Sequence, residues 1–179
     1  IERELDYNFN FCQENLVRSS KNVLRGLHFQ KPPYAQAKLV RYIHGKVLDV
    51  VVDIRDGSKT YGQHIAIELS GENKKQVFIP RGFAHGFLVL SNFAIFSYKV
   101  DNLYSEKYER GILYNDPALK INWKLKECNL QKNRIYFLNK SIYINNINRF
   151  YSSTLPRSYI YHWFFITRSL KYTARRIAH

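Results

Sequence analysis

The sequence is poor in cysteine and has no long apolar run, and each lack excludes a class of protein. Its two cysteines, Cys12 and Cys128, are too few for the disulfide framework of a small secreted domain and do not have metal-ligand spacing. No apolar stretch reaches the ~20 residues that a membrane-spanning helix needs. Residues 1–9, IERELDYNF, have no signal-peptide pattern. We therefore expect a soluble protein of the cytoplasm.

Acidic residues are absent from the C-terminal part of the chain. All 14 Asp and Glu lie in residues 1–127, where 19 Lys and Arg outnumber them by five, and the other nine basic residues lie in 128–179. A modestly basic body suits an anionic small molecule. We do not expect a nucleic-acid partner, because that role would depend on the charge of the C-terminal part alone.

Helical periodicity is also missing, and short strands separated by turns take its place. The run 38–55 reads as a strand, a turn at His44–Gly45 and a longer Val-rich strand. Further strands are expected over 62–70, 76–80, and then 86–90 and 94–100, a pair around Ser91–Asn92. Many short strands at close spacing predict an all-β sandwich or closed barrel.

The chain divides into one domain, residues 1–140, and an atypical tail, residues 141–179. The tail begins with an Asn- and Ser-rich stretch and continues through the aromatic run YIYHWFFI, residues 159–166, to a basic end. Three interpretations are open. The tail is a strand or helix packed on the body, an unstructured or non-native segment, or an arm for nucleic acid or a membrane surface.

The run VLRGLHFQ, residues 23–30, places a histidine in an apolar strand. Arg25 and His28 are three residues apart, so in a regular strand they would face opposite sides. A bulge or bend at Gly26 would let both side chains reach one cavity. The alternative is that His28 is a packed core histidine with one hydrogen bond.

A second run, IPRGFAHGF at residues 79–87, combines a sharp bend with another histidine. Pro80 and Gly82 bend the chain between two strands, and His85 begins the next strand. Bends of this kind at the mouth of a β-barrel aim side chains inward.

Together these runs resemble the dTDP-4-dehydrorhamnose 3,5-epimerase family. The resemblance covers about two thirds of the chain, in the stretches 13–15, 19–41, 45–62, 68–73, 78–92, 98–104 and 109–123. It implies a cupin-type jelly-roll β-barrel with a few short helices near the C-terminus.

The resemblance also implies an enzyme that moves protons on a dTDP-linked 4-keto-6-deoxy sugar and needs no cofactor. By similarity His28 is the base, since the pKa of an imidazole lies near the working pH. Lys38 stabilises the enolate oxygen, and Tyr98 is the acid on the other face of the ring. The product would be dTDP-4-dehydro-L-rhamnose, an intermediate of dTDP-rhamnose synthesis.

Further residues match binding positions of the family. Arg25 matches a diphosphate contact, for which a guanidinium is well suited. Asp49 is the expected carboxylate partner of His85. The substrate-binding positions are Gln13, Asn15, Arg25, Lys38, His85, Tyr104 and Glu109. The resemblance also implies a homodimer.

The sequence departs from the family pattern at two places. Asn133 stands where the family has an Asp that orients the base histidine, and an amide can accept a hydrogen bond but cannot balance an imidazolium charge. The family's first N-terminal strands are also missing from the sequence.

Three other functions stay open beside the 3,5-epimerase. The chain could epimerise C3 only, or it could be a degenerate cupin that binds sugar nucleotides without catalysis. A metal-dependent cupin would need about three clustered ligands, and the segment around His28 has no His-x-His.

Overall fold

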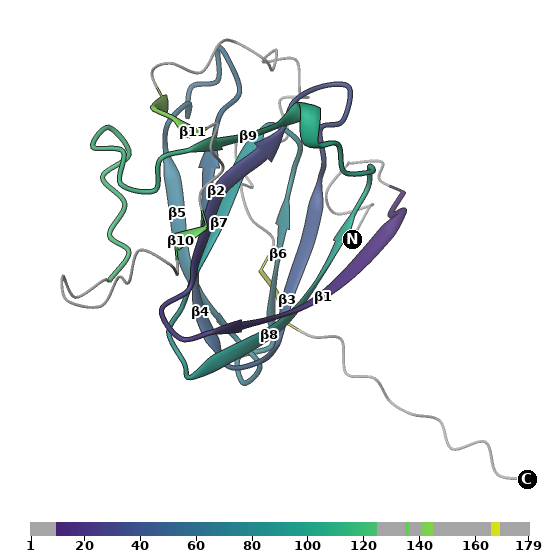
Figure 1. The fold of residues 1–179 in the computed structure, drawn as a ribbon, viewed down its shortest axis with the longest axis vertical. Coiled ribbons are helices and arrows are strands. Elements are labelled where there is room, and N and C mark those ends of the chain that lie inside the picture. The colour runs from purple at the N-terminus through teal and green to yellow at the C-terminus, as the bar shows by residue number, and fades with distance from the viewer. Residues whose placement is uncertain (1–9, 125–134, 137–140, 145–165, 169–179) are drawn as a thin grey trace, which may run out of the picture.

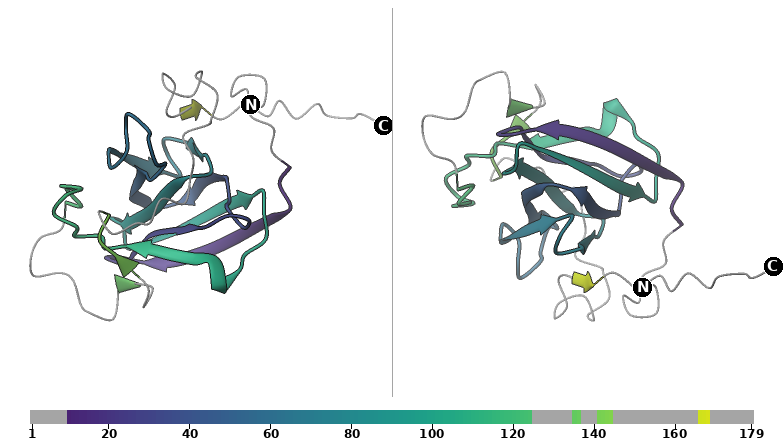
Figure 2. Two further views of the ribbon diagram at one scale, coloured as in Figure 1. Left: turned by 90° about the horizontal axis from the view of Figure 1, so that it is seen from above. Right: turned by 90° about the horizontal axis from the view of Figure 1, so that it is seen from below.

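Alternating apolar and polar side chains organise the chain into two β-sheets that face each other. The computed structural model describes residues 10–124, 135–136, 141–144 and 166–168. Figure 1 shows the strands, and Figure 2 shows the two sheets as layers from above and below. The strands are β1 (Gln13–Ser20), β2 (Leu24–Gln30), β3 (Lys38–His44), β4 (Lys46–Asp53), β5 (His64–Ser70), β6 (Lys75–Ile79), β7 (Phe83–Val89), β8 (Phe93–Val100), β9 (Glu109–Ile112), β10 (Ile135–Tyr136), β11 (Ser141–Ile142) and β12 (Ile166–Arg168).

The strand order is that of a jelly roll, as expected. One sheet has the order β1-β8-β3-β6-β12, and the other has β11-β9-β2-β7-β4-β5 with β10 alongside β2. The predicted turn at His44–Gly45 carries the chain from one sheet to the other. The connection after β7 does the same, so the expected pair 86–90 and 94–100 is wrong: β7 pairs with β2 and β4, and β8 pairs with β1 and β3.

Helices contribute little to the described part of the chain. Its one helix is the short 3-10 helix η1, Glu106–Tyr108, and no helix there is long and apolar enough to cross a membrane. The short helices expected near the C-terminus are not among the described residues. Of the tail, β11 pairs with β9 and β12 pairs with β6. Most of residues 141–179 lie outside the described residues, and the boundary at residue 140 stays a prediction.

Strand β4 explains why the sequence has a Val-rich run. Its side chains are buried on both faces: Val47 and Val51 pack between the sheets, whereas Leu48, Val50 and Val52 face the other side. A strand covered on both faces has a continuous apolar run instead of an alternating one.

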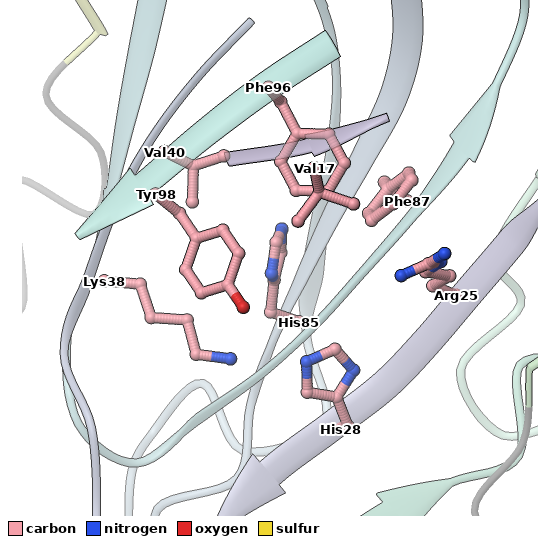
Figure 3. Close-up of a pocket in the computed structure, with 9 residues that line it drawn as sticks. All are labelled: Val17, Arg25, His28, Lys38, Val40, His85, Phe87, Phe96 and Tyr98. Atoms are coloured by element: carbon pink, nitrogen blue, oxygen red, sulfur yellow. The ribbon is translucent and has the colours of Figure 1, made fainter. Parts of the chain in front are cut away.

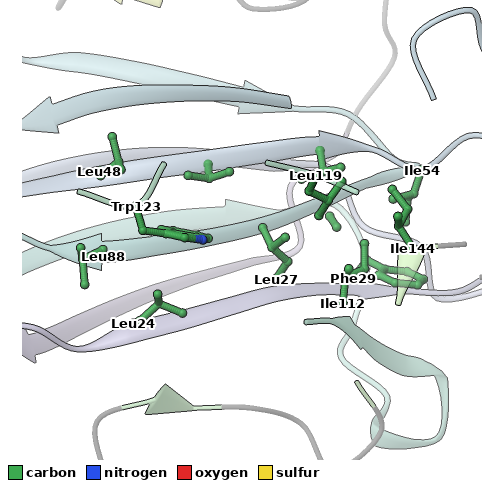
Figure 4. Packing of buried hydrophobic residues seen from close by; sticks show 13 residues of the cluster. Leu24, Leu27, Phe29, Leu48, Ile54, Leu88, Ile112, Leu119, Trp123 and Ile144 are labelled. Carbon is green, nitrogen blue, oxygen red and sulfur yellow. The ribbon is translucent and has the colours of Figure 1, made fainter. Parts of the chain in front are cut away.

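The second face of this sheet is covered by the segment after β9. Figure 4 shows Trp123 packed between Leu48 and Leu88, with Leu119 farther along the same face, near Leu27. The Trp123 side chain is 5% exposed, and its indole N–H donates a hydrogen bond to the carbonyl of Tyr114 at 2.8 Å. This cover lets the inner face of the sheet carry polar groups while the outer face supplies apolar burial.

Two glycines let β2 and β7 approach each other closely. The register between these strands shifts between Arg25 and His28, which is the irregularity expected at Gly26. Gly26 has a φ of 108°, and a Cβ there would lie 2.5 Å from the Cα of Gly86. A Cβ on Gly86 would in turn lie 2.8 Å from the carbonyl oxygen of Arg25. Side chains at either position would therefore push the strands apart.

Replacing Gly26 by alanine is expected to destabilise the fold more than the same change at Gly62. Both glycines have positive φ, but among the described residues a Cβ on Gly62 meets only the Ile144 side chain, at 3.6 Å. Gly62→Ala should lower the free energy of unfolding by about 1 kcal/mol, the cost of the left-handed backbone. Gly26→Ala should lower it by about 3 kcal/mol or more, because backbone overlap adds to that cost. Urea unfolding of both variants measures the difference, and equal losses would contradict the close approach.

Candidate active site

Two cavities lie between the sheets and share three polar residues. The inner cavity, about 70 Å³, is lined by Val17, Arg25, His28, Lys38, Val40, His85, Phe87, Phe96 and Tyr98. The outer cavity, about 310 Å³, is lined by Gln13, Asn15, His28, Gln30, Gln36, Lys38, Tyr98, Val100, Tyr104 and Glu109. His28, Lys38 and Tyr98 belong to both. The structure thus brings together all seven residues for which binding was predicted.

His28 lies on β2 directly opposite His85 of β7, and their ring centroids are 6.2 Å apart. Burial, and then the neighbouring Lys38, His85 and Arg25, hold the pKa of His28 well below its usual value. The ring is therefore neutral at physiological pH and has a lone pair available. A packed core histidine would not line an open cavity, so the alternative interpretation of His28 is not supported.

Lys38 enters the same space from the opposite sheet. It is the first residue of β3, and the whole residue is only 9% exposed. Burial lowers the pKa of its ammonium group to about 8, while Glu109 and Asp49 oppose that shift. Lys38 therefore carries its charge at neutral pH but titrates far closer to neutrality than an exposed lysine.

Tyr98 is on β8, beside Val40 of β3 in the register of the sheet. Figure 3 shows its hydroxyl, the Lys38 amine and the His28 ring pointing into a common space. Burial raises the pKa of Tyr98, with Arg25 opposing and Glu109 adding to the shift. The phenol is therefore protonated at neutral pH and can donate a proton.

His85 is held by the carboxylate that was expected to hold it. Its Nε2 lies 3.0 Å from both carboxylate oxygens of Asp49, and both residues are at most 5% exposed. Because the carboxylate accepts, Nε2 carries a proton. This contact fixes the ring of His85 beside His28.

Sequence reasoning missed the second donor to this carboxylate. The hydroxyl of Tyr42, on β3, donates to Asp49 Oδ2 at 3.2 Å, and burial raises the pKa of Tyr42 well above its usual value. The hydrogen bond joins the two sheets across the interior. Tyr42 follows Lys38 and Val40 on the inward face of β3, as alternation along a strand explains, but alternation does not show its partner.

Arg25 reaches the inner cavity because of the irregularity at Gly26. It lies on the same side as His28 although the two residues are three apart in sequence. Figure 3 shows its guanidinium beside Phe87, across the cavity from Lys38. An arginine so placed can hold an anionic group near the histidines.

The remaining predicted residues surround the outer cavity. The side-chain amide of Gln13 donates to Asn15 Oδ1 at 2.8 Å on β1. The hydroxyl of Tyr104 donates to Glu109 Oε2 at 2.7 Å, and this hydrogen bond, with burial and nearby acidic charge, raises the pKa of Tyr104 to about 12. This paired tyrosine and glutamate form one wall of the opening.

Two predictions receive no support from the structure. Asn133 lies outside the described residues, so its place behind His28 stays a prediction. Over the described ranges, no group of three or more His, Cys, Asp and Glu side chains is arranged to hold a metal ion, so the metal-dependent alternative gains nothing.

The sequence model of the dTDP-4-dehydrorhamnose 3,5-epimerase family matches residues 2–139. The chain is 51% identical over 126 residues to the enzyme of that name from Shigella flexneri, a match covering 70% of each chain. It is 54% identical over 123 residues to the Escherichia coli K12 enzyme, covering 69% of this chain and 66% of that one. The match thus spans about two thirds of these relatives.

Solved structures agree with this result. A Legionella pneumophila dTDP-6-deoxy-D-glucose-3,5-epimerase, crystallised with dTDP-4-keto-L-rhamnose, superposes with a TM-score of 0.77 at 43% identity, covering 86% of this chain and 81% of that one. The Elizabethkingia anophelis dTDP-4-dehydrorhamnose 3,5-epimerase superposes with a TM-score of 0.69 at 52% identity, covering 70% of this chain and 69% of that one. The chain belongs to the dTDP-4-dehydrorhamnose 3,5-epimerase family.

Proposed function

We propose that the protein epimerises dTDP-4-dehydro-6-deoxy-D-glucose at C3 and C5, giving dTDP-4-dehydro-L-rhamnose. One observation carries the proposal: a neutral histidine, a buried ammonium group and a protonated phenol converge on one space from two sheets. Family membership supplies the substrate class, and the convergence of these three groups supports the proposal that they carry the reaction.

The reaction starts with His28. The C4 ketone of the sugar acidifies the hydrogens on C3 and C5, and the neutral ring of His28 accepts one of them as a proton. Burial and the cations around it hold the pKa of His28 low and keep the ring in the basic form. The same cations attract the anionic substrate and the negative charge that develops on it.

Lys38 stabilises the enolate that forms. Its ammonium group is preorganised in a buried site, where a charge interacts more strongly than in water. Negative charge grows on the C4 oxygen as the carbon loses its proton, so this interaction strengthens toward the transition state. That difference is what lowers the barrier.

Tyr98 returns a proton from the other side. His28 stands on the seven-stranded sheet and Tyr98 on the five-stranded sheet, so a sugar lying between them has one group on each face. Deprotonation on one face and protonation on the other inverts the carbon. Once His28 has released its proton to water and Tyr98 has taken one up, the same cycle at the second carbon completes the 3,5-epimerisation, and no step of this scheme uses a cofactor.

The remaining residues hold the nucleotide. Arg25 binds the diphosphate, while Gln13, Asn15, Tyr104 and Glu109 line the part of the outer cavity in which the nucleoside would lie. His85, held by Asp49, contacts the sugar. We further propose that the protein acts as a cytoplasmic homodimer in dTDP-rhamnose synthesis, as the family resemblance implies.

Solvent exchange tests the proposed function. Incubated with dTDP-4-dehydro-6-deoxy-D-glucose in D₂O, the protein is expected to incorporate deuterium at C3 and C5, detected by NMR and mass spectrometry. His28→Ala should abolish incorporation because the base is lost. Tyr98→Phe should keep exchange and lose inversion, because the base is intact and the opposing acid is missing.

The same measurement separates the competing functions. Deuterium at C3 alone would identify an enzyme specific for C3. Binding of dTDP by calorimetry with no exchange above the His28→Ala background would identify a non-catalytic binding protein and overturn the proposal.

The rate should fall on the alkaline side as Lys38 loses its proton. The ammonium group titrates at about 8, so kcat/KM should fall by about tenfold per pH unit well above that value. On the acid side, His28 has a depressed pKa, so the decline should begin below about pH 6.5, the value for a free histidine.

The substitution Lys38→Arg identifies the alkaline group. A guanidinium stays charged over this range, so the decline above pH 8 should disappear in that variant, whatever its absolute rate. Lys99→Arg is the matched control, since the Lys99 side chain is 46% exposed on β8. An unchanged alkaline limb in Lys38→Arg would refute the assignment.

Asn133→Asp should increase the rate. If Asn133 occupies the position of the orienting carboxylate, restoring the negative charge stabilises the imidazolium form of His28 that arises during the reaction. In a serine protease the reverse change costs about 10⁴ in kcat. We therefore expect Asn133→Asp to raise kcat about tenfold or more. Asn129→Asp, in the same segment, is the control. Equal rates in the two variants would show that Asn133 does not serve this position.

A further inference from the structure

We propose that Gln30 is a positioning residue that holds the nucleotide-binding Tyr104 in register with the base, His28. Gln30 ends the run VLRGLHFQ and had no assigned role. The inference rests on the proposed function, since it assigns a task within the same site. It concerns how the position of Tyr104, where the nucleoside would bind, is fixed relative to His28 in the same cavity.

Gln30 bonds the backbone on both sides of Tyr104. Its side-chain amide donates to the carbonyl of Leu103 at 3.3 Å and accepts from the N–H of Ser105 at 2.7 Å. The residue is 5% exposed and lines the outer cavity. The side-chain amide of Gln30 thus takes the place of a neighbouring strand: it satisfies one backbone carbonyl and one backbone N–H, on the two sides of Tyr104.

The loop around Tyr104 needs such bonds because it has no strand partner. Residues 101–105 lie between β8 and η1 without regular secondary structure. Other side chains hold the start of this loop. Among them, Gln36 donates to the carbonyl of Asn102 at 2.8 Å, and Asp101 accepts from the N–H of Ala37 at 2.6 Å. These contacts lie N-terminal to Leu103. Of the side-chain hydrogen bonds described for this loop, those of Gln30 are the ones that hold the residues on both sides of Tyr104.

The position of Gln30 on β2 gives these bonds their functional meaning. Gln30 follows His28 by two residues, so both side chains lie on the same face of the strand, about 7 Å apart along it. Gln30 also stands opposite Glu109 in the register with β9, and Glu109 accepts from the Tyr104 hydroxyl at 2.7 Å. The backbone around Tyr104 is therefore held by Gln30 at the end of β2, and the Tyr104 hydroxyl is held by Glu109, which lies opposite Gln30. The strand that carries the base fixes where the nucleoside is held.

The substitution Gln30→Met tests this coupling. Methionine keeps the length and the buried volume but makes neither hydrogen bond. We expect KM for the sugar nucleotide and Kd for dTDP to rise about tenfold, because the backbone around Tyr104 loses the two hydrogen bonds that hold it, while kcat stays within about twofold. Gln63→Met, the same change at an exposed residue that lines neither cavity, should leave both constants unchanged.

A double-mutant cycle with Tyr104→Ala decides whether Gln30 acts through Tyr104. If it does, Gln30→Met has no further effect on dTDP binding once the tyrosine is gone. Equal effects of Gln30→Met with and without Tyr104, or a loss of kcat with KM unchanged, would overturn the inference. Gln30→Glu serves if the methionine variant does not fold. It keeps the acceptor for Ser105 and loses the donor to Leu103, and Kd should rise by a smaller factor that is again abolished by Tyr104→Ala.

The binding readout separates this inference from the proposed function. Calorimetry with dTDP needs no turnover, so the cycle gives an answer even if the protein shows no exchange in D₂O. Coupling in the cycle without turnover would retain the role of Gln30 and refute catalysis. Turnover without coupling would support the proposed catalysis and refute the role of Gln30.

Discussion

The close approach of β2 and β7 at Gly26 and Gly86 is the constraint on which the site depends. Side chains of a regular strand alternate, so residues three apart face opposite sides. The register shift between Arg25 and His28 changes this relation, and both side chains reach the inner cavity. The same shift leaves His28 opposite His85, whose ring is fixed by Asp49. A cation for the substrate and a base beside it thus come from one short strand.

Charge is arranged in the cavity so that each group has the protonation state its task needs. The cations Arg25 and Lys38, with burial, keep His28 neutral. Glu109 and Asp49 work against burial at Lys38, and its pKa stays near 8 instead of falling further. Each carboxylate is itself held by a tyrosine hydroxyl, from Tyr104 and Tyr42. Among the described residues, the carboxylates that act on Lys38 do not shift the pKa of His28. A neutral His28 and a charged Lys38 can therefore occupy the same cavity.

Sequence reasoning could predict the parts of the structure that follow from alternation and turn residues. The strands between Val23 and Lys99 and the irregularity at Gly26 belong to this group. Family resemblance added the fold and the identity of the site residues. Strand β1 was not recognised, because its exposed edge position gives Gln13–Ser20 little apolar alternation.

Strand partners and side-chain hydrogen bonds could not be predicted in the same way. Alternation shows which face a residue occupies but not which strand lies beside it, so β7 and β8 were expected to form a pair although they belong to different sheets. Alternation along β3 puts Tyr42 on the same face as Lys38 and Val40, yet its hydrogen bond to Asp49 depends on how far apart the sheets stand. Gln30 is similar, because an amide in a strand shows no sign of the loop that it will hold 73 residues later.

The proposed base, His28, and the proposed acid, Tyr98, stand on different sheets, and this has a consequence for how such an enzyme can change. The gap between them is set by aromatic side chains that are not among the reacting groups: Phe87 of one sheet packs edge-to-face on Phe96 of the other, with ring centroids 4.8 Å apart, and both also line the inner cavity. Tyr42 packs against Phe96 at 5.2 Å beside them. A change of size at these spacers would widen or narrow the slot for the sugar with every reacting group left in place. The width of the slot, and with it the range of sugars accepted, can therefore evolve through the core.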